Sequence, residues 1–212
     1  MEWALPEVDT YFRKILENTP NGFEIDHLEE ALKYCTRFRT AVDGGAHIGT
    51  WSVHLATRFR KVLAFEPATD TYKCLAQNTA HMLNILPLRA ALGARDGSCI
   101  VVDDLTRMGN TGSRMIVNGI GDNAHCIVPL DALDRYKLED LDFLKLDVEG
   151  YEVEALKGAV ETIRNCRPTI MVECKQFSPP RNGGPEATIQ LLTNLGYNEV
   201  GGIRNDRVFT VS

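Results

Sequence analysis

The sequence predicts an α/β fold with a doubly wound, mostly parallel sheet of the Rossmann-like kind. Short apolar runs alternate with segments of helical periodicity along most of the chain. Two of these runs, Arg39 to Val42 and Leu141 to Leu146, end in acidic, glycine-containing turns, as parallel strands do where a helix follows. The length of 212 residues fits one domain. In such open sheets ligands bind outside the carboxyl ends of the strands, so both turns are candidate site segments.

The first 38 residues are expected to form an N-terminal helical cap. One helix is predicted from Val8 to Glu17. A second opens at Asp26, an N-cap residue, and its apolar face carries Leu28, Ala31, Leu32 and Cys35.

Strands and helices alternate from residue 39 onward. The expected strands are Thr40 to Asp43, Lys61 to Glu66, Ile85 to Leu92, Leu141 to Asp147 and Pro168 to Glu173. The expected helices are Gly49 to Arg60, Thr69 to Thr79, a helix bearing Leu156, Ala159, Val160 and Ile163, and Glu186 to Leu195. Asn198 to Gly201 and Val208 to Val211 close the sheet as an antiparallel pair around Asn205 and Asp206, so the last strand is antiparallel.

Residues 96–131 interrupt this alternation. Three β-like runs, Cys99 to Val102, Arg114 to Val117 and His125 to Val128, predict a β insertion between strands three and four, lying over the crevice. Its loop Gly109 to Ser113 is either a lip on the acceptor side of the site or an ordinary surface hairpin.

Composition excludes several classes of protein. The net charge of −6 gives no general attraction to nucleic acid or anionic membrane. No apolar run approaches the ~20 residues of a membrane span, and the acidic first nine residues do not predict a signal peptide. Six scattered cysteines, none in a CxxC pair, predict reduced thiols, a cytoplasmic location and no zinc site. The aromatic share is 8%, and no aromatic cluster indicates a pocket for a flat ring, so a polar substrate is favoured.

The first candidate motif is the turn from Asp43 to Gly49. Gly45 and Gly49 let the backbone approach a ligand and begin a helix whose N–H groups point into the crevice. A dinucleotide fold favours GxGxxG, but Ala46 stands where the second glycine belongs. Asp43 would repel a pyrophosphate, whereas it suits the ammonium and sulfonium of S-adenosylmethionine (SAM).

The second motif, Phe65-Glu66-Pro67, ends the second strand. Glu66 lies 21 residues beyond Gly45, the spacing at which a carboxylate accepts hydrogen bonds from ribose hydroxyls. This feature serves NAD and SAM equally. The alternative is that Glu66 caps the following helix.

The third motif, Leu144 to Glu152, favours SAM. Lys145 and Asp147 share one face of a strand, Glu149 follows in the turn, and Glu173 lies at the tip of the next strand. Crowded carboxylates raise one another's pKa, so one of them can act as a general base. The same oxygens could hold a divalent metal, although no metal is predicted.

These motifs together resemble the FkbM-type family of SAM-dependent methyltransferases. The likeness covers about residues 40–175 and rests on Asp-x-Gly-Ala-x-Ile-Gly, Ala-Phe-Glu-Pro and Leu-Lys-Leu-Asp-Val-Glu-Gly-Tyr-Glu, with Val172-Glu173 also in place. It implies a seven-stranded class I fold over residues 39–212 and methyl transfer to oxygen, often a sugar hydroxyl, with S-adenosylhomocysteine (SAH) as product. It also implies that Asp43, Gly45 and Glu66 bind SAM. His47 departs from the family, which commonly has asparagine there; it could donate to the SAM carboxylate or make binding pH-sensitive.

The predicted site has two parts. The cofactor-binding residues are Asp43, Gly44, Gly45, Ala46, His47, Gly49, Glu66, Pro67 and Asp96. Asp96 is included because the third strand ends without an acid, so adenine recognition is expected to rest on backbone groups and on Asp96 or Ser98. Asp147 or Glu149 is the expected general base, Glu173 is the next candidate and Lys145 is the electrostatic partner.

Two rival functions stay open on the sequence. A nicotinamide-dependent oxidoreductase would share the fold and Glu66, but Asp43 and the lack of a Tyr-x-x-x-Lys or His-based hydride site argue against it. A catalytically silent domain that docks to a glycosyltransferase or another assembly would keep the fold without turnover. The acceptor is expected to be a small polar molecule or a glycan.

Overall fold

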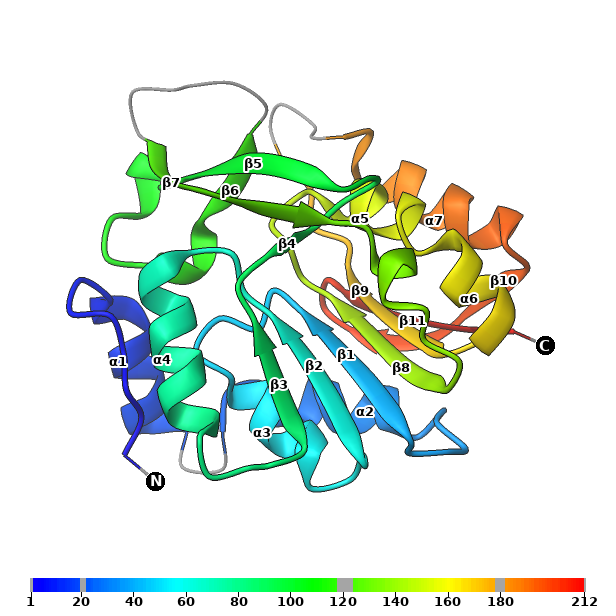
Figure 1. The fold of residues 1–212 in the computed structure, drawn as a ribbon, viewed down its shortest axis with the longest axis horizontal. Coiled ribbons are helices and arrows are strands. Elements are labelled where there is room, and N and C mark those ends of the chain that lie inside the picture. The colour runs from blue at the N-terminus through cyan, green and yellow to red at the C-terminus, as the bar shows by residue number, and fades with distance from the viewer. Residues whose placement is uncertain (1, 20–21, 118–123, 178–181, 212) are drawn as a thin grey trace.

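The computed structural model describes residues 2–19, 22–117, 124–177 and 182–211, and it centres on a seven-stranded sheet (Figure 1). The strand order is β10-β11-β9-β8-β1-β2-β3. The strands are β1 (Thr40–Gly44), β2 (Lys61–Phe65), β3 (Ile85–Leu88), β8 (Leu141–Leu146), β9 (Thr169–Glu173), β10 (Tyr197–Ile203) and β11 (Asp206–Val211). β11 is antiparallel to β9 and to β10, and the pairs among β9, β8, β1, β2 and β3 are parallel. The predicted doubly wound sheet with an antiparallel last strand is confirmed.

Helices cover both faces of this sheet. One face carries α2 (Ile25–Leu32), α3 (Thr50–Ala56) and α4 (Thr69–Thr79), and the other carries α5 (Glu152–Lys157), α6 (Val160–Cys166) and α7 (Gly184–Asn194). Successive strand residues face opposite layers, so Ala41 belongs to the same apolar cluster as Leu28 of α2, while Val42 belongs to the cluster of Leu156 of α5. Burial on both faces explains why the central strands are almost continuously apolar.

The N-terminal helices differ in detail from the sequence prediction. α1 (Thr10–Asn18) begins after Asp9, whose side chain accepts a hydrogen bond from the Phe12 amide and caps the helix. α2 begins at Ile25, so the predicted N-cap at Asp26 is wrong; the N-cap residue is Glu24, in a left-handed conformation with φ of 48°.

The helix predicted after β8 is two helices. α5 ends at Lys157 and α6 begins at Val160 because the chain turns at Gly158. A Cβ at Gly158 would lie 1.9 Å from the carbonyl oxygen of Gly93. This close backbone contact joins the α5–α6 turn to the segment that enters the β insertion.

The β insertion is a second, four-stranded sheet in the order β4-β7-β5-β6, above the carboxyl ends of β1 to β3 in Figure 1. Its strands are β4 (Ala91–Leu92), β5 (Gly97–Val102), β6 (Met115–Val117) and β7 (Ala124–Asp131). The predicted third strand is therefore divided: Ile85–Leu88 lies in the central sheet, and Ala91–Leu92 pairs with β7 in the second. Short 3-10 helices lie at Leu105–Arg107 (η1), Thr111–Ser113 (η2) and Leu133–Tyr136 (η3).

Two expectations drawn from composition can be compared with the structure. Within the described parts of the chain, every helix is too short or too polar to cross a membrane. All six cysteines are free thiols, with Cys99 buried and the other five partly exposed.

We expect Gly158→Ala to lower the free energy of unfolding by about 2–3 kcal/mol, because the new methyl group meets backbone that cannot move aside. Gly97→Ala is the matched control, since no atom lies within 4 Å of a Cβ there. Urea unfolding of both variants measures the difference. Equal stabilities would contradict the proposed role of the Gly158–Gly93 contact.

Candidate active site

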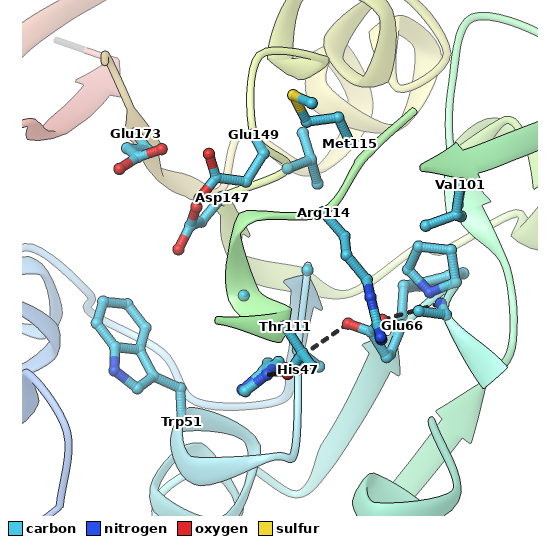
Figure 2. Close-up of a pocket in the computed structure, with 18 of the residues that line it drawn as sticks. His47, Trp51, Glu66, Val101, Thr111, Arg114, Met115, Asp147, Glu149 and Glu173 are labelled. Carbon is cyan, nitrogen blue, oxygen red and sulfur yellow. Dashed lines mark hydrogen bonds between the residues drawn. The ribbon is translucent and has the colours of Figure 1, made fainter. Parts of the chain in front are cut away.

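A cavity of about 270 Å³ lies where the carboxyl ends of β1, β2 and β8 meet the second sheet (Figure 2). Nine of the thirteen predicted site residues line it: Gly45, Ala46, His47, Glu66, Pro67, Lys145, Asp147, Glu149 and Glu173. Asp43, Gly44, Gly49 and Asp96 do not line it. The topology thus brings most of the predicted residues around one space.

The glycine turn is packed tightly against the neighbouring strands. Gly45 has φ of 75°, and a Cβ there would lie 1.8 Å from the carbonyl oxygen of Asp147, so only glycine fits. The amides of Gly45 and Ala46 donate to the Phe65 carbonyl at 3.0 and 2.9 Å. His47 has φ of 51°, a conformation that asparagine and histidine tolerate better than most residues.

Asp43 and Lys145 form a buried ion pair beneath this turn. The Asp43 side chain is fully buried; its Oδ2 accepts from Ser52 Oγ at 2.6 Å, and its Oδ1 lies 3.0 Å from Lys145 Nζ. Lys145 Nζ also donates to the Gly45 carbonyl at 2.8 Å. Burial alone would lower the pKa of Lys145, but the carboxylates of Asp43 and Asp147 outweigh it and raise that pKa. Lys145 lines the cavity and Asp43 does not, although the sequence predicted Asp43 as a cofactor-binding residue.

Glu66 lines the cavity and also contacts the start of α4. Its Oε1 accepts from the Ala68 amide at 2.9 Å and the Thr71 hydroxyl at 2.7 Å, at the start of α4. Its Oε2 accepts from the His47 amide at 2.9 Å, and the side chain lines the cavity. Burial raises the pKa of Glu66.

Beside Glu66 the cavity has an apolar wall, formed by Pro67, Ala68, Ala90, Ala91, Leu92, Val101 and Ile116. The polar side chains of His47, Thr111 and Arg114 also lie near Glu66 (Figure 2). Asp96 lies elsewhere, where its Oδ1 accepts from the Ala132 amide at 2.9 Å beside η3.

The opposite part of the cavity is acidic. In Figure 2, Asp147, Glu149 and Glu173 lie together, away from Glu66. One oxygen from each of the three lies within 4.8 Å of the others, a spacing at which they could hold a cation. Lys175 Nζ donates to Glu149 at 2.8 Å and lies 3.9 Å from Glu173, which offsets part of this negative charge.

Crowding and burial set the protonation of these carboxyls. Burial first, and then the charges of Asp147 and Glu149, raise the pKa of Glu173 to about 10. Burial and Asp147 also raise the pKa of Glu149, which has a left-handed backbone with φ of 51°. Strained backbone of this kind is typical of functional turns.

Several cavity residues were missed on the sequence. The low aromatic share suggested no aromatic pocket, yet Tyr11, Phe12, Phe23 and Trp51 all line the cavity. So do Glu24, Asp206, Arg107 and Arg114, which come from segments far apart in the chain. The lip residues Asn110 to Gly112 also line the cavity, in agreement with one of the two interpretations of that loop.

We expect Lys145→Met to destabilise the fold by about 3–5 kcal/mol, because it leaves the buried Asp43 carboxylate without its cation. The double variant Asp43→Asn, Lys145→Met removes both charges and should recover much of the loss. Denaturant unfolding measures the free energies. A double variant as unstable as the single one would contradict this account.

The raised pKa of Glu173 predicts a pH-dependent stability. Between the ordinary value of 4.5 and about 10, the folded state keeps a proton that the unfolded chain releases. Stability therefore falls as pH rises through this range, and Glu173→Gln, which cannot titrate, should gain stability relative to the wild type from pH 5 to pH 8. Free energies of unfolding measured at pH 5 and pH 8 test this, with Glu139→Gln, at an exposed position, as the control. An advantage of Glu173→Gln that is the same at both pH values would contradict it.

The sequence is similar to known methyltransferases. The methyltransferase FkbM domain family matches residues 43–199. The hexuronic acid methyltransferase AglP of Haloferax volcanii is 28% identical over 136 residues, covering 61% of this chain and 53% of that protein. The methyltransferase sdnD of Sordaria araneosa is 29% identical over 167 residues, covering 62% of this chain and 64% of that protein. The chain thus spans about half to two thirds of the length of these relatives.

Solved structures show the same fold. A methyltransferase FkbM from Methylobacillus flagellatus superposes with a TM-score of 0.57 at 18% identity, over 87% of this chain and 49% of that one. A SAM-dependent methyltransferase from Aquifex aeolicus gives a TM-score of 0.51 at 12% identity, over 95% and 97% of the two chains. Because the family match covers most of the chain, the protein belongs to the FkbM methyltransferase family.

Proposed function

We propose that this protein transfers the methyl group of SAM to a hydroxyl of a small polar or glycan acceptor, with a sugar hydroxyl as the preferred target. The observation that carries the proposal is the division of one cavity into two unlike parts, one beside Glu66 that has an apolar wall and an acidic one around Asp147, Glu149 and Glu173. A relative that acts on a hexuronic acid supports a sugar acceptor.

The part beside Glu66 suits the adenosine portion of SAM. Glu66 retains lone pairs toward the cavity for the ribose hydroxyls, since its three hydrogen bonds do not use all four acceptor positions. The apolar wall beside Glu66, which includes Pro67 and Ile116, suits a flat adenine ring. Backbone groups would then bind the polar edge of that ring. Asp96 has no part in this assignment, because it lies outside the cavity.

The charges near the glycine turn suit the methionine portion of SAM. Asp147 has a side chain that is 42% exposed and lies 4.0 Å from Lys145 Nζ, so it can face an ammonium group while Lys145 faces a carboxylate. In this proposal Asp43 acts through Lys145, and not by direct contact with the cofactor.

Glu149 is the proposed general base. Bound SAM supplies an electrophilic methyl group: the carbon–sulfur bond breaks as the carbon–oxygen bond forms, and SAH leaves with the electron pair. A neutral hydroxyl is a poor nucleophile, so a carboxylate that takes its proton speeds the displacement. The raised pKa of Glu149 suits this role, and Lys175 holds the carboxylate in place at 2.8 Å. Glu173, with a pKa near 10, carries a proton at neutral pH and is better suited to donate a hydrogen bond to the acceptor.

Calorimetric titration of the purified protein with SAM, SAH and NAD tests the cofactor. We expect SAM and SAH to bind, NAD not to bind, and Glu66→Ala to weaken SAM binding by about tenfold or more because the ribose loses its carboxylate. Binding of NAD alone would favour the oxidoreductase, and binding of none of the three would favour a docking domain.

We expect Glu149→Gln to leave the SAM dissociation constant within a few-fold of the wild type and to reduce turnover at least ~100-fold. Turnover is measured as transfer of a labelled methyl group to a panel of neutral sugars, hexuronic acids and amino sugars. Glu154→Gln is the control, since Glu154 pairs with Lys157 on α5 and does not line the cavity. If Glu149→Gln lost SAM affinity and turnover equally, Glu149 would instead organise the cofactor site.

A further inference from the structure

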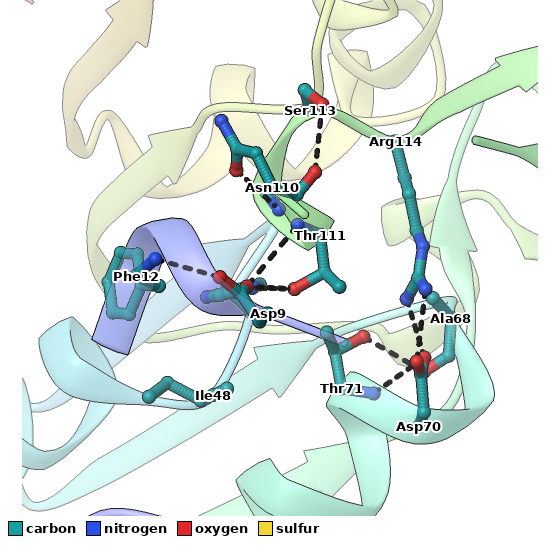
Figure 3. Close-up of polar contacts among 12 residues, drawn as sticks. Asp9, Phe12, Ile48, Ala68, Asp70, Thr71, Asn110, Thr111, Ser113 and Arg114 are labelled. Carbon is teal, nitrogen blue, oxygen red and sulfur yellow. Dashed lines mark hydrogen bonds and ion pairs between the residues drawn. The ribbon is translucent and has the colours of Figure 1, made fainter. Parts of the chain in front are cut away.

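Asp9 is a fully buried carboxylate at a junction of three segments (Figure 3). Its Oδ1 accepts from the Phe12 amide at 2.7 Å and caps α1. Its Oδ2 accepts from both the amide and the hydroxyl of Thr111, in the lip loop Gly109–Ser113. His47 Nε2, from the glycine turn, lies 3.5 Å from the same oxygen. One side chain thus contacts the N-terminal helix, the lip and the predicted cofactor loop.

The hydrogen-bond directions at this junction are fixed by chemistry. The single proton of the Thr111 hydroxyl goes to Asp9, so the hydroxyl oxygen must accept from His47 Nε2, 2.7 Å away. The resulting chain runs from His47 through Thr111 to Asp9. Burial alone would raise the pKa of Asp9, but the nearby His47 ring and the hydrogen bonds from Thr111 and Phe12 outweigh it and lower that pKa, which keeps Asp9 an acceptor.

Backbone contacts hold the same segments together. The Tyr11 amide donates to the Gly109 carbonyl at 3.0 Å. Asn78 of α4 exchanges hydrogen bonds with Ala4 at 2.8 and 3.0 Å and donates to the Ile48 carbonyl at 2.9 Å, beside the glycine turn. On its other side the lip continues into Arg114, whose guanidinium binds Asp70 at the start of α4. The N-terminal segment is therefore fixed against the lip and the glycine turn, and its Tyr11 and Phe12 line the cavity.

We propose that Asp9 is a positioning residue of the active site, which holds His47 and Thr111 so that the cofactor loop and the lip form one wall. The proposal rests on the proposed function, since it assumes that SAM binds beside His47. His47 connects the junction to the cofactor because its amide donates to Glu66, the proposed ribose ligand, at 2.9 Å. Asp9 lies outside residues 43–199, so this part of the site belongs to the N-terminal segment and not to the matched family domain.

The test compares SAM affinity with stability in matched variants. Asp9→Asn replaces one carboxylate oxygen by an NH2 group. That group then faces either the amide and hydroxyl of Thr111 or the amide of Phe12, which are themselves hydrogen-bond donors. Thr111→Val removes only the hydroxyl, and Thr111→Ser restores it. Asp134→Asn is the control, because both oxygens of Asp134 accept from backbone amides, those of Glu161 and Thr162, at the start of α6 and away from the cavity.

We expect Asp9→Asn and Thr111→Val each to raise the SAM dissociation constant about tenfold, equivalent to about 1.4 kcal/mol. The double variant should also lose about tenfold in SAM affinity and not a hundredfold, because both changes break the same chain of hydrogen bonds. Thr111→Ser should stay within about twofold of the wild type, and Asp134→Asn should lower the melting temperature without changing SAM affinity.

If Asp9→Asn and Thr111→Val lowered the melting temperature as Asp134→Asn does, but left SAM affinity unchanged, the role of Asp9 would be structural only and the proposal would fall. Failure of the wild type to bind SAM is a different result, which overturns the proposed function and this inference with it.

Discussion

The ammonium group of Lys145 joins the two central strands at the edge where the site lies. It is buried between the Asp43 carboxylate and the Gly45 carbonyl, and it lies 4.0 Å from Asp147 and 5.4 Å from the centre of the Trp51 ring. A buried charge is tolerated only where paired groups replace the water it has lost. The position of the glycine turn, and with it the floor of the cavity, therefore depends on this arrangement.

Both turns at this edge contain a non-glycine residue in the left-handed region and a nearby glycine there. His47 and Glu149 both have φ of 51°; Gly49, two residues after His47, has φ of 92°, and Gly150, directly after Glu149, has φ of 93°. Each turn stops a parallel strand and begins a helix within a few residues, so the chain must reverse with little length. The strain of two non-glycine residues in the left-handed region is balanced by the hydrogen bond of His47 to Glu66 and the ion pair of Glu149 with Lys175.

The central strands position the charges, and the surrounding segments close the space around them. Gly45 and Glu66 directly follow β1 and β2, and Lys145 lies in β8, whereas the aromatic side chains come from residues 11–51 and the lip from the loop between β5 and β6.

The sequence by itself determined the sheet and the positions of its acidic strand ends. Periodicity and turn residues identify β1, β2, β8 and β9 almost to the residue, because local hydrophobic pattern and turn chemistry decide where a buried strand stops. For the same reason Gly45, Glu66, Asp147 and Glu149 could be named before any contact was known.

Tertiary structure decided what each of those groups faces. Only the pairing of β1 with β8 sets Lys145 opposite Asp43 and takes Asp43 out of the cavity wall. Only the packing of α5 and α6 around the Gly158–Gly93 contact breaks one predicted helix in two. The junction of Asp9, His47 and Thr111 joins residues up to 102 positions apart, and no local pattern encodes such a contact because its energy exists only after the chain has folded.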